Sequence, residues 1–536
     1  MQTMYFGGNI LTMEEDSGLV EAVLVENGRI QKTGTRQEVE EATEASEVEK
    51  VDLKGQTLMP SFIDAHSHIT YVGPVSQMAD LSGCMDFDEV VETLHQYITT
   101  NNIEAGAAVI GFGYDHTLLK EEDHPRKEVL NRLPENPVFV FHASAHMGCA
   151  NDFLLEKAGI DADTEDVEGG AIGRVEASCE PDGFLEETSL TLIQPYLFAH
   201  MDPDYMKLLE EGQRVYIKNG ITTAQDGATP LESVELCRAF AEQNRFHIDV
   251  IAYPMADEEP EKIFEAYPRH ANTYHRRFKL GGYKMFLDGT PQGKTAWLTE
   301  PYEGETEYRG NGWYKDEQVK RFTDAAVQNG VQLLAHCNGD AASDQLLQSY
   351  RDSVREAGES EDDLRPVMIH AQTVRDDQLE SMKQIGMIPS MFIDHTYYWG
   401  DVHLNNLGEK RGTRISPARS AIDKGLMVNF HQDSPVIEPD MFQTIWSAVN
   451  RMTRNGTRVG TEQRVSVYEA LQAVTINAAF QYKEEVDKGS ISEGKYADFI
   501  IVDRHPLDID PSDLREIQVV ETIKEGRTIY REGEFF

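Results

Sequence analysis

Short apolar runs alternate with longer polar stretches of helical character through the middle of the chain. Val331–His336, Val367–His370 and Met427–His431 are three such runs, each next to a polar, helix-like segment. Apolar strands that alternate with helices are typical of parallel βα units. The alternation therefore predicts an α/β fold built on parallel strands.

Both ends of the chain are rich in short strands instead. Asn27–Gly28 is a hairpin turn signal near the N-terminus, and Gly526–Arg527 marks a second turn near the C-terminus. The strands predicted at the two ends are Asn9–Met13, Ala22–Glu26, Arg29–Thr33, Asp498–Val502, Thr522–Lys524 and Thr528–Tyr530. We expect residues 1–57 and 488–536 to form one small composite β-sandwich domain.

The middle of the chain is longer than a simple barrel requires. The roughly 430 residues from 58 to 487 exceed the ~250 that are typical of a (β/α)8 barrel. A stretch rich in charge and glycine, at about Gly83–His200, is the best place for additional structure. The prediction is a (β/α)8 TIM barrel at 58–487 that carries an inserted α/β segment at about 83–200.

Composition limits the partners and the compartment. The chain has 536 residues, of which 93 are acidic and 49 basic, and a net charge of −44 repels nucleic acid and anionic membranes. No uninterrupted apolar window is long enough to span a membrane. The five cysteines are scattered and form no C-x-x-C pair, which argues against a disulfide framework. We expect a cytoplasmic protein with no nucleic-acid or membrane partner.

The segment Leu58–His68, which reads LMPSFIDAHSH, is the most informative in the chain. An apolar run ends in His66 and His68, and alternate residues of an extended strand point to the same face. Two imidazoles on one face can hold a metal ion. In barrel enzymes, functional groups lie at strand ends, so the position favours a metal site over two structural histidines.

Four further strands carry a polar residue at or near their ends. These residues are Lys284, His336, His370 and Asp433. Lys284 lies within the apolar strand Gly282–Asp288, and a buried lysine is costly unless it is neutralised, paired or modified. Each residue alone could be structural, but their repetition at successive strand ends predicts a shared site.

These residues resemble the amidohydrolase superfamily, and specifically its YtcJ-like branch (amidohydrolase family 3). The resemblance covers essentially the whole chain. The segments that carry it are Pro60–His68, Gly220–Asp226 (GITTAQD), Lys284–Gly289 (KMFLDG), Ile369–Gln372 (IHAQ), Asp433–Pro435 (DSP), Thr475–Ala479 (TINAA) and Gly489–Val502. The sequence departs from the usual family pattern at His431–Gln432, where glycine and serine often precede the aspartate.

The resemblance implies a centre of two divalent metal ions, usually zinc. His66, His68 and Asp433 would bind one ion, and His336 and His370 the second. Lys284 would be carboxylated and bridge both ions, which would explain a buried lysine. A mononuclear site with unmodified Lys284 is the alternative.

The implied activity is that of a metal-dependent hydrolase that cleaves a C–N bond in an amide, formamide or cyclic amide of a small molecule. A metal-activated hydroxide would attack the carbonyl, and Asp433 would carry the proton to the departing amine. His146, His431 and Asp288 are candidate substrate-binding residues, and Asp288 could instead orient a ligand.

Other readings stay open. The same metal site could serve ester or lactone hydrolysis, decarboxylation or isomerisation, because a fold does not determine chemistry. A non-catalytic binding protein is a further alternative, although none of the implied ligands is missing. A homodimer is implied only by the family.

Overall fold

The chain forms two compact units. The computed structural model describes residues 2–14, 20–43, 48–144, 146–167, 169–198, 204–256, 259–358 and 363–536. The main unit contains Met1–Thr70 and Gln213–Phe536, and the second unit contains Tyr71–Gly212. The proposed insertion at 83–200 falls within the range of the second unit, but its end, His200, lies outside the described residues, so its bounds stay a prediction.

One sheet of the main unit contains only strands from the N-terminal residues. Its order is β4-β3-β1-β5, and its strands are β1 Gln2–Phe6, β3 Ala22–Glu26, β4 Arg29–Gly34 and β5 Val48–Asp52. β3 and β4 are antiparallel, and the residues between them, Asn27 and Gly28, have φ angles of 52° and 80°. Asn and Gly tolerate this left-handed conformation, and the predicted hairpin is confirmed.

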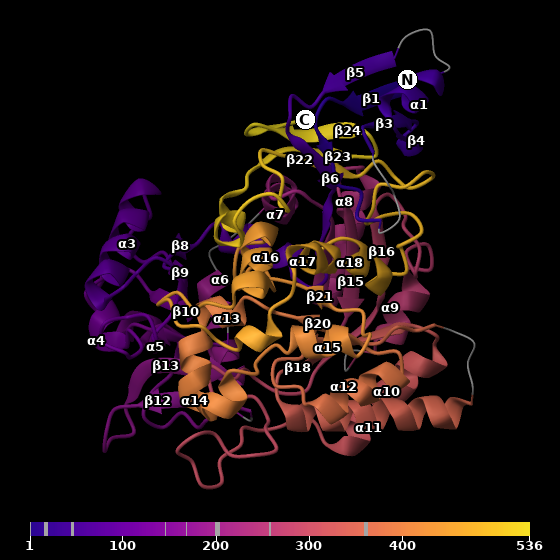
Figure 1. Cartoon of the computed structure of the whole chain (residues 1–536). Coiled ribbons are helices and arrows are strands. Elements are labelled where there is room, and N and C mark those ends of the chain that lie inside the picture. The colour runs from indigo at the N-terminus through magenta and orange to yellow at the C-terminus, as the bar shows by residue number, and fades with distance from the viewer. Residues whose placement is uncertain are drawn as a thin grey trace. The chain divides into compact units, whose positions relative to one another are not determined.

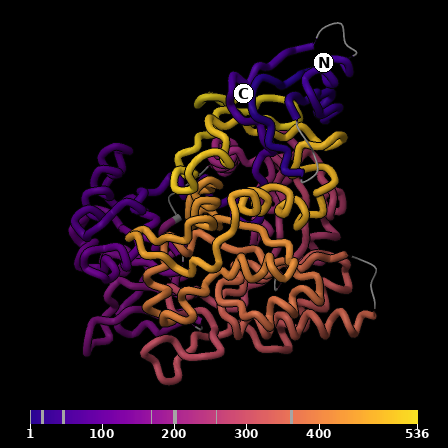
Figure 2. The backbone as a smooth tube through the Cα atoms, viewed as in Figure 1, coloured from indigo at the N-terminus to yellow at the C-terminus, as the bar shows by residue number. Residues whose placement is uncertain are grey.

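A second sheet joins the two ends of the chain. Its order is β2-β6-β22-β23-β24-β25, with β2 Asn9–Ile10, β6 Thr57–Pro60, β22 Phe499–Val502, β23 Val519–Lys524, β24 Arg527–Arg531 and β25 Glu534–Phe535. β6 and β22 are antiparallel, so the indigo and yellow parts of the chain meet there (Figures 1 and 2). The second turn lies at Glu525–Gly526, one residue earlier than predicted, because Arg527 already pairs with Lys524 in the ladder.

The two terminal sheets share one apolar cluster. Tyr5 of β1 and Phe499 of β22 meet edge to face, with their ring centroids 5.7 Å apart. The other buried members from the strands of both sheets are Val23, Val25, Ile30, Leu58, Ile501 and Ile523. Burial of apolar surface from both sheets therefore stabilises the pairing of the chain ends.

Parallel strands form the centre of the main unit. One sheet has the order β16-β15-β14-β7 and the other runs from β17 to β21 in chain order. The strands are β7 Phe62–Ile63, β14 Ile221–Thr229, β15 Asp249–Pro254, β16 Phe278–Leu280, β17 Gly282–Phe286, β18 Gln332–Cys337, β19 Val367–His370, β20 Ile388–Met391 and β21 Asn429–Phe430. A parallel bridge between Met255 and Lys284 links the two sheets.

Helices alternate with these strands. They include α8 Leu231–Glu242, α9 Pro260–Ala266, α10 Asp316–Gln328, α11 Asp340–Ala357, α12 Asp376–Gln384, α15 Ala418–Asp423, α16 Met441–Asn450, α17 Val467–Ala473 and α18 Ile476–Gln481. In α10, Val319, Phe322 and Ala326 are buried and lie three or four residues apart, which places them on one face. Acidic residues in its first turn favour the positive end of the helix dipole. The predicted α/β architecture is confirmed.

The second unit has its own mixed sheet. The order is β12-β13-β11-β10-β9-β8, with β8 Ala79–Asp80, β9 Val109–Tyr114, β10 Val138–His142, β11 Met147–Ala150, β12 Gly170–Arg174 and β13 Pro181–Glu187. β8, β9 and β10 are parallel, and the other pairs are antiparallel. Its helices include α3 Phe87–Thr100, α4 Lys127–Leu130, α5 Asp152–Ala158 and α6 Gln194–Phe198. Among the described helices, we find none with the length and apolar character needed to cross a lipid bilayer.

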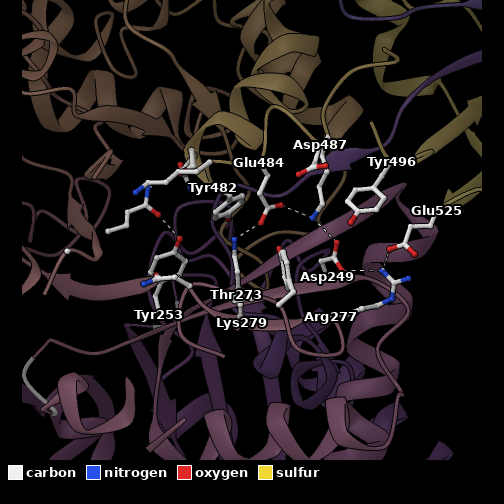
Figure 3. A pocket seen from close by; sticks show the side chains of 18 residues that line it. Asp249, Tyr253, Thr273, Arg277, Lys279, Tyr482, Glu484, Asp487, Tyr496 and Glu525 are labelled. Carbon is white, nitrogen blue, oxygen red and sulfur yellow. Dashed lines mark hydrogen bonds and ion pairs between the residues drawn. The ribbon is translucent and has the colours of Figure 1, made fainter. Parts of the chain in front are cut away.

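A cavity of about 750 Å³ in the main unit contains a network of buried charges rather than any predicted site residue (Figure 3). Lys488 Nζ lies 2.7 Å from Asp249 Oδ2 and 2.7 Å from Glu484 Oε2. Burial opposes ionisation of Asp249, but the ammonium groups of Lys488 and Lys524 hold the pKa of Asp249 far below its usual value. Because the buried charges are paired, removal of one partner would leave an uncompensated buried charge and destabilise the main unit.

We expect Lys488→Met to lower the free energy of unfolding by about 3–5 kcal/mol, because the substitution leaves buried carboxylates without one of their cations. Chemical denaturation measures the change. The control is Lys262→Met, since Lys262 and its partner Glu259 are both 70% exposed and such pairs contribute little. Equal stability of the two variants would show that the network is not stabilising.

Candidate metal centre

His66 and His68 direct their Nε2 atoms at one carboxylate. His66 Nε2 lies 3.3 Å, and His68 Nε2 3.2 Å, from Asp433 Oδ1. We predicted that the two histidines lie on one face of an extended strand, and this is wrong. β7 ends at Ile63, and both histidines lie in the bent segment that follows it. Hydrogen bonds from Asp433 N to His66 O and from His68 N to Ser434 O connect this bend to the segment after β21. The backbone therefore brings together residues that are far apart in the sequence.

Gln225, near the middle of β14, determines which ring nitrogen of His66 carries the proton. Its amide nitrogen donates to Ala65 O and to Tyr482 Oη, each at 2.8 Å, so that Gln225 Oε1 faces His66 Nδ1 at 2.5 Å. An amide oxygen only accepts hydrogen bonds. His66 must therefore donate from Nδ1, and its Nε2 keeps a lone pair directed at Asp433.

His68 also carries its proton on Nδ1, and the two lone pairs that face Asp433 favour a cation between them. His68 Nδ1 lies 2.6 Å from the carbonyl of Gly227, which can only accept, so Nε2 again keeps a lone pair. Asp433 Oδ1 has no hydrogen-bond partner among the described residues. The ligand atoms of His66, His68 and Asp433 all lie within 4.8 Å of one another. At a zinc–nitrogen distance of about 2.0–2.1 Å, tetrahedral ligands are about 3.3 Å apart, so this donor set fits a zinc-type ion.

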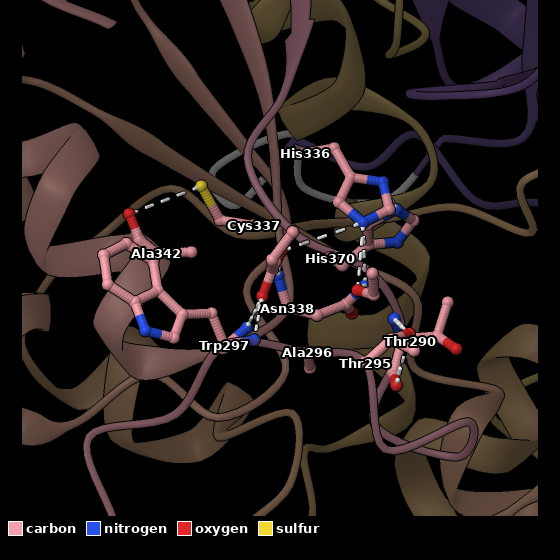
Figure 4. Close-up of polar contacts among 12 residues, drawn as sticks. Thr290, Thr295, Ala296, Trp297, His336, Cys337, Asn338, Ala342 and His370 are labelled. Carbon is pink, nitrogen blue, oxygen red and sulfur yellow. Dashed lines mark hydrogen bonds and ion pairs between the residues drawn. The ribbon is translucent and has the colours of Figure 1, made fainter. Parts of the chain in front are cut away.

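His336 and His370 form a second pair at the ends of β18 and β19. His336 Nδ1 and His370 Nε2 are 3.1 Å apart, and the rings lie close together (Figure 4). Burial lowers the pKa of His370 well below its usual value, so the ring is neutral at pH 7 and can act as a ligand. His370 Nε2 is also 3.8 Å from Asp433 Oδ2. Asp433 thus connects the two histidine pairs.

Lys284 lies in the middle of β17 and is fully buried. Its Nζ is 3.3 Å from His66 Nε2 and 4.8 Å from the ring centroid of Phe286. Burial lowers the pKa of Lys284 to about 8. The amine therefore lies beside His66, with an increased neutral fraction near pH 7, and its role as a bridge between two ions stays a prediction.

Burial and the neighbouring rings act on the pKa of Asp433 in opposite directions. Burial raises the pKa, whereas protonation of the rings of His66, His370 and His68 would lower it. The side chains of His68 and Asp433 are 18% and 14% exposed, whereas that of His66 is 1% exposed. Asp433 and His68 therefore lie on the side of the centre that solvent reaches.

His431 is fully buried beside the predicted ligands. Its ring centroid is 5.1 Å from that of His66 and 5.2 Å from that of His370. Neither ring nitrogen has a hydrogen-bond partner among the described residues. Burial lowers the pKa of His431 to about 3, so the ring is neutral. Its role in binding substrate stays a prediction.

Asp288 is held by backbone N–H groups at the ends of β17 and β18. It accepts hydrogen bonds from Asn338 N and Trp297 N at 2.9 Å and from Gly339 N at 2.7 Å; Figure 4 shows Asn338 and Trp297 beside His336. Burial raises the pKa of Asp288 to about 7. Its Oδ1 is 3.9 Å from His336 Nε2, so Asp288 ties together the loops that surround this histidine.

The other candidate substrate residue, His146, belongs to the second unit. Its Nδ1 lies 2.9 Å from Glu187 Oε2. The structure therefore places eight predicted residues, Asp433 and Asp288 among them, in the main unit, and His146 in the second unit.

Two contributors to the centre were not predicted from the sequence. Gln225 and the Gly227 carbonyl determine the tautomers of His66 and His68, respectively. Gln225 stands within the segment GITTAQD, and a glutamine in an otherwise apolar strand is a signal that it has a buried polar partner. The Gly227 carbonyl has no such signal, because every residue carries one.

The sequence matches the amidohydrolase family over residues 49–530. The chain therefore belongs to the amidohydrolase family, and the resemblance inferred from the sequence is confirmed.

Relatives match along nearly the whole chain. The N-substituted formamide deformylase of Arthrobacter pascens is 29% identical over 98% of this chain and 97% of its own length. The Bacillus subtilis (strain 168) protein YtcJ is 26% identical over 99% of this chain and 100% of its own length. Among solved structures, an uncharacterized metal-dependent hydrolase from Pyrococcus horikoshii has a TM-score of 0.76 at 24% identity, covering 95% of this chain and 99% of that chain.

We expect Gln225→Leu to weaken zinc binding about 10–100-fold, because the partner that orients His66, a predicted ligand, is lost. Titration with a competing chelator measures the affinity. The matched control is Gln348→Leu, an exposed position on α11. An unchanged zinc affinity in Gln225→Leu would contradict the proposed role of this glutamine.

Proposed function

We propose that the chain is a metal-dependent hydrolase that cleaves the C–N bond of a small amide, formamide or cyclic amide. The observation that carries the proposal is the convergence of His66 Nε2 and His68 Nε2 on Asp433 Oδ1, at 3.3 and 3.2 Å, with both lone pairs fixed by hydrogen bonds on the far side of the rings. Neutral imidazoles and one carboxylate are a donor set suited to zinc.

The residues present fit two divalent ions. His66, His68 and Asp433 would hold the first, and His336 and His370 the second. Lys284 would join them as a carbamate, which forms when the neutral amine adds carbon dioxide and releases a proton. Divalent ions bound there would lower the pKa of water and polarise a carbonyl group.

Asp433 performs the proton transfers. As a carboxylate, it accepts the proton that water loses when the water oxygen bonds to the carbonyl carbon. Protonated Asp433 then donates to the nitrogen of the scissile bond, which leaves as a neutral amine when the C–N bond breaks. The balance is one amide and one water to one carboxylic acid and one amine. A single residue can serve both steps because it regains its charge after the second.

N-substituted formamides are the first substrates to test. The Arthrobacter pascens relative carries that substrate class in its name, and family membership supports hydrolysis of a C–N bond.

We also propose that the two parallel sheets close into a (β/α)8 barrel, with the composite terminal domain attached at one side and the insertion at about 83–200. The Met255–Lys284 bridge and the bond from Asp433 N to His66 O support closure.

We expect Asp433→Asn to lower kcat on a hydrolysed formamide by about 10²–10⁴-fold, because the amide cannot accept the proton from water. Release of formate and amine from a panel of N-substituted formamides, other amides and matched esters measures activity. Asp423→Asn, an exposed position on α15, is the control. Zinc-loaded protein that turns over only the esters, or a fully active Asp433→Asn variant, would overturn the proposal.

We expect Lys284→Ala to reduce the metal content from about two ions per chain in this centre, because the group proposed to join them is removed. Elemental analysis of protein purified with and without bicarbonate provides the measurement, and Lys410→Ala, at an exposed position of helix α14 (Gly400–Gly412), is the control. Unchanged metal content would show that Lys284 is not a bridge.

A further inference from the structure

A second cluster of ligand-type side chains lies in the second unit, where β9 and β10 end. β9 and β10 are neighbouring parallel strands, and His142 is paired with Tyr114 at their carboxyl ends. Asp115 and His116 follow β9 directly. Polar side chains after adjacent parallel strands converge at one edge of the sheet, so residues from two distant segments meet here.

The spacing of the cluster matches that of a metal site. His116 Nδ1 lies 3.2 Å from His142 Nε2, and His142 Nε2 lies 3.5 Å from Asp115 Oδ1. The ligand atoms of all three residues lie within 4.8 Å of one another. Two tetrahedral ligands of zinc are separated by about 3.3 Å at metal–nitrogen distances of about 2.0–2.1 Å. The ligand atoms therefore need only small shifts to surround one ion.

Asp115 and His142 are buried, His116 is half-buried, and contacts hold all three side chains in place. Asp115 is 5% exposed and His142 is 1% exposed. Thr117 donates to Asp115 Oδ1 from its backbone N–H at 3.0 Å and from its hydroxyl at 2.7 Å. The ring of His124 stacks on that of His116, with the centroids 4.2 Å apart. These contacts restrict the side chains before any ion binds, which reduces the entropy lost on binding.

Ser144 allows His142 to offer its Nε2 lone pair. The Ser144 hydroxyl lies 2.9 Å from His142 Nδ1, and the Ser144 backbone N–H lies 3.0 Å from it. The hydroxyl can accept a hydrogen bond from a protonated Nδ1, whereas the N–H can donate to an unprotonated one. The backbone contact places the His142 proton on Nε2 when no ion is bound. An ion at Nε2 requires the proton to move to Nδ1, where the Ser144 hydroxyl can accept its hydrogen bond, as the partners behind ligating histidines do.

We propose that Asp115, His116 and His142 form a binding site for one zinc-type divalent ion, separate from the centre in the main unit. Two imidazoles and one carboxylate select borderline ions such as zinc over calcium or magnesium, which prefer all-oxygen sites. The bound ion joins the loop that follows β9 to the end of β10, and so stabilises this edge of the second unit.

Metal stoichiometry of the full chain tests the proposal. The variants are His116→Asn/His142→Asn, the conservative Asp115→Asn, and His95→Asn as the control, because His95 is an exposed histidine on α3 of the same unit. Each protein is loaded with zinc, dialysed and analysed for ions per chain. The double variant and Asp115→Asn should each hold about one ion fewer than the wild type, and His95→Asn should match the wild type.

A second measurement isolates the site from the main centre. In a background that carries His66→Asn, His68→Asn, His336→Asn and His370→Asn, titration with Co²⁺ should give the visible absorption of a tetrahedral histidine–carboxylate site, and zinc should displace it. Adding His116→Asn/His142→Asn should abolish that absorption, while circular dichroism reports whether each variant is folded. Zinc stoichiometry that is the same with and without the three ligands overturns the proposal. If those variants do not fold, absence of the cobalt signal in the background protein overturns it.

Discussion

Hydrogen bonds on the outer side of the His66 and His68 rings determine which ring nitrogens face Asp433. The Gln225 side chain and the Gly227 carbonyl each accept a hydrogen bond from the Nδ1–H of a histidine, and this leaves two nitrogen lone pairs directed at one carboxylate oxygen. Such an arrangement is repulsive without a nearby positive charge, such as a metal ion or the Lys284 ammonium 3.3 Å from His66 Nε2. The tautomers decide whether these rings can bind a metal ion, because a ring that carries its proton on Nε2 could not be a ligand through that nitrogen.

The same logic explains why residues remote from the reaction are polar and buried. Gln225 is itself held by Ala65 O and the Tyr482 hydroxyl, so that its amide cannot turn over and present a donor to His66. Tyr482 also donates to Asp64 O, two residues before His66. A chain of oriented dipoles therefore runs from α18 and its following turn to the first histidine, and each link depends on the one before it.

Much of this could be read from the sequence, and the limits have physical causes. Apolar alternation located the parallel strands, and polar residues at their ends located His66, His68, Lys284, His336, His370 and Asp433, which the fold brings close together. The sequence did not reveal that β7 stops at Ile63, because the bend after it is held by backbone bonds to the segment near Asp433. Nor could it reveal the Gly227 carbonyl, since local composition carries no information about which carbonyl a distant ring will reach.

The pairing of β6 with β22 has a consequence for how the protein is made. Pro60 and Phe499 are opposite each other in the sheet, so about 440 residues of chain separate the two partners. At roughly 5–20 residues per second, a ribosome needs about 20–90 s to deliver β22 after β6 has emerged. During that interval, one edge of β6 has no partner strand. His66 and His68, which follow β7 in the sequence, also have no Asp433 to contact until that residue is synthesised. Assembly of this protein is therefore a late event in synthesis, and the nascent N-terminal segment is the part most in need of protection by chaperones.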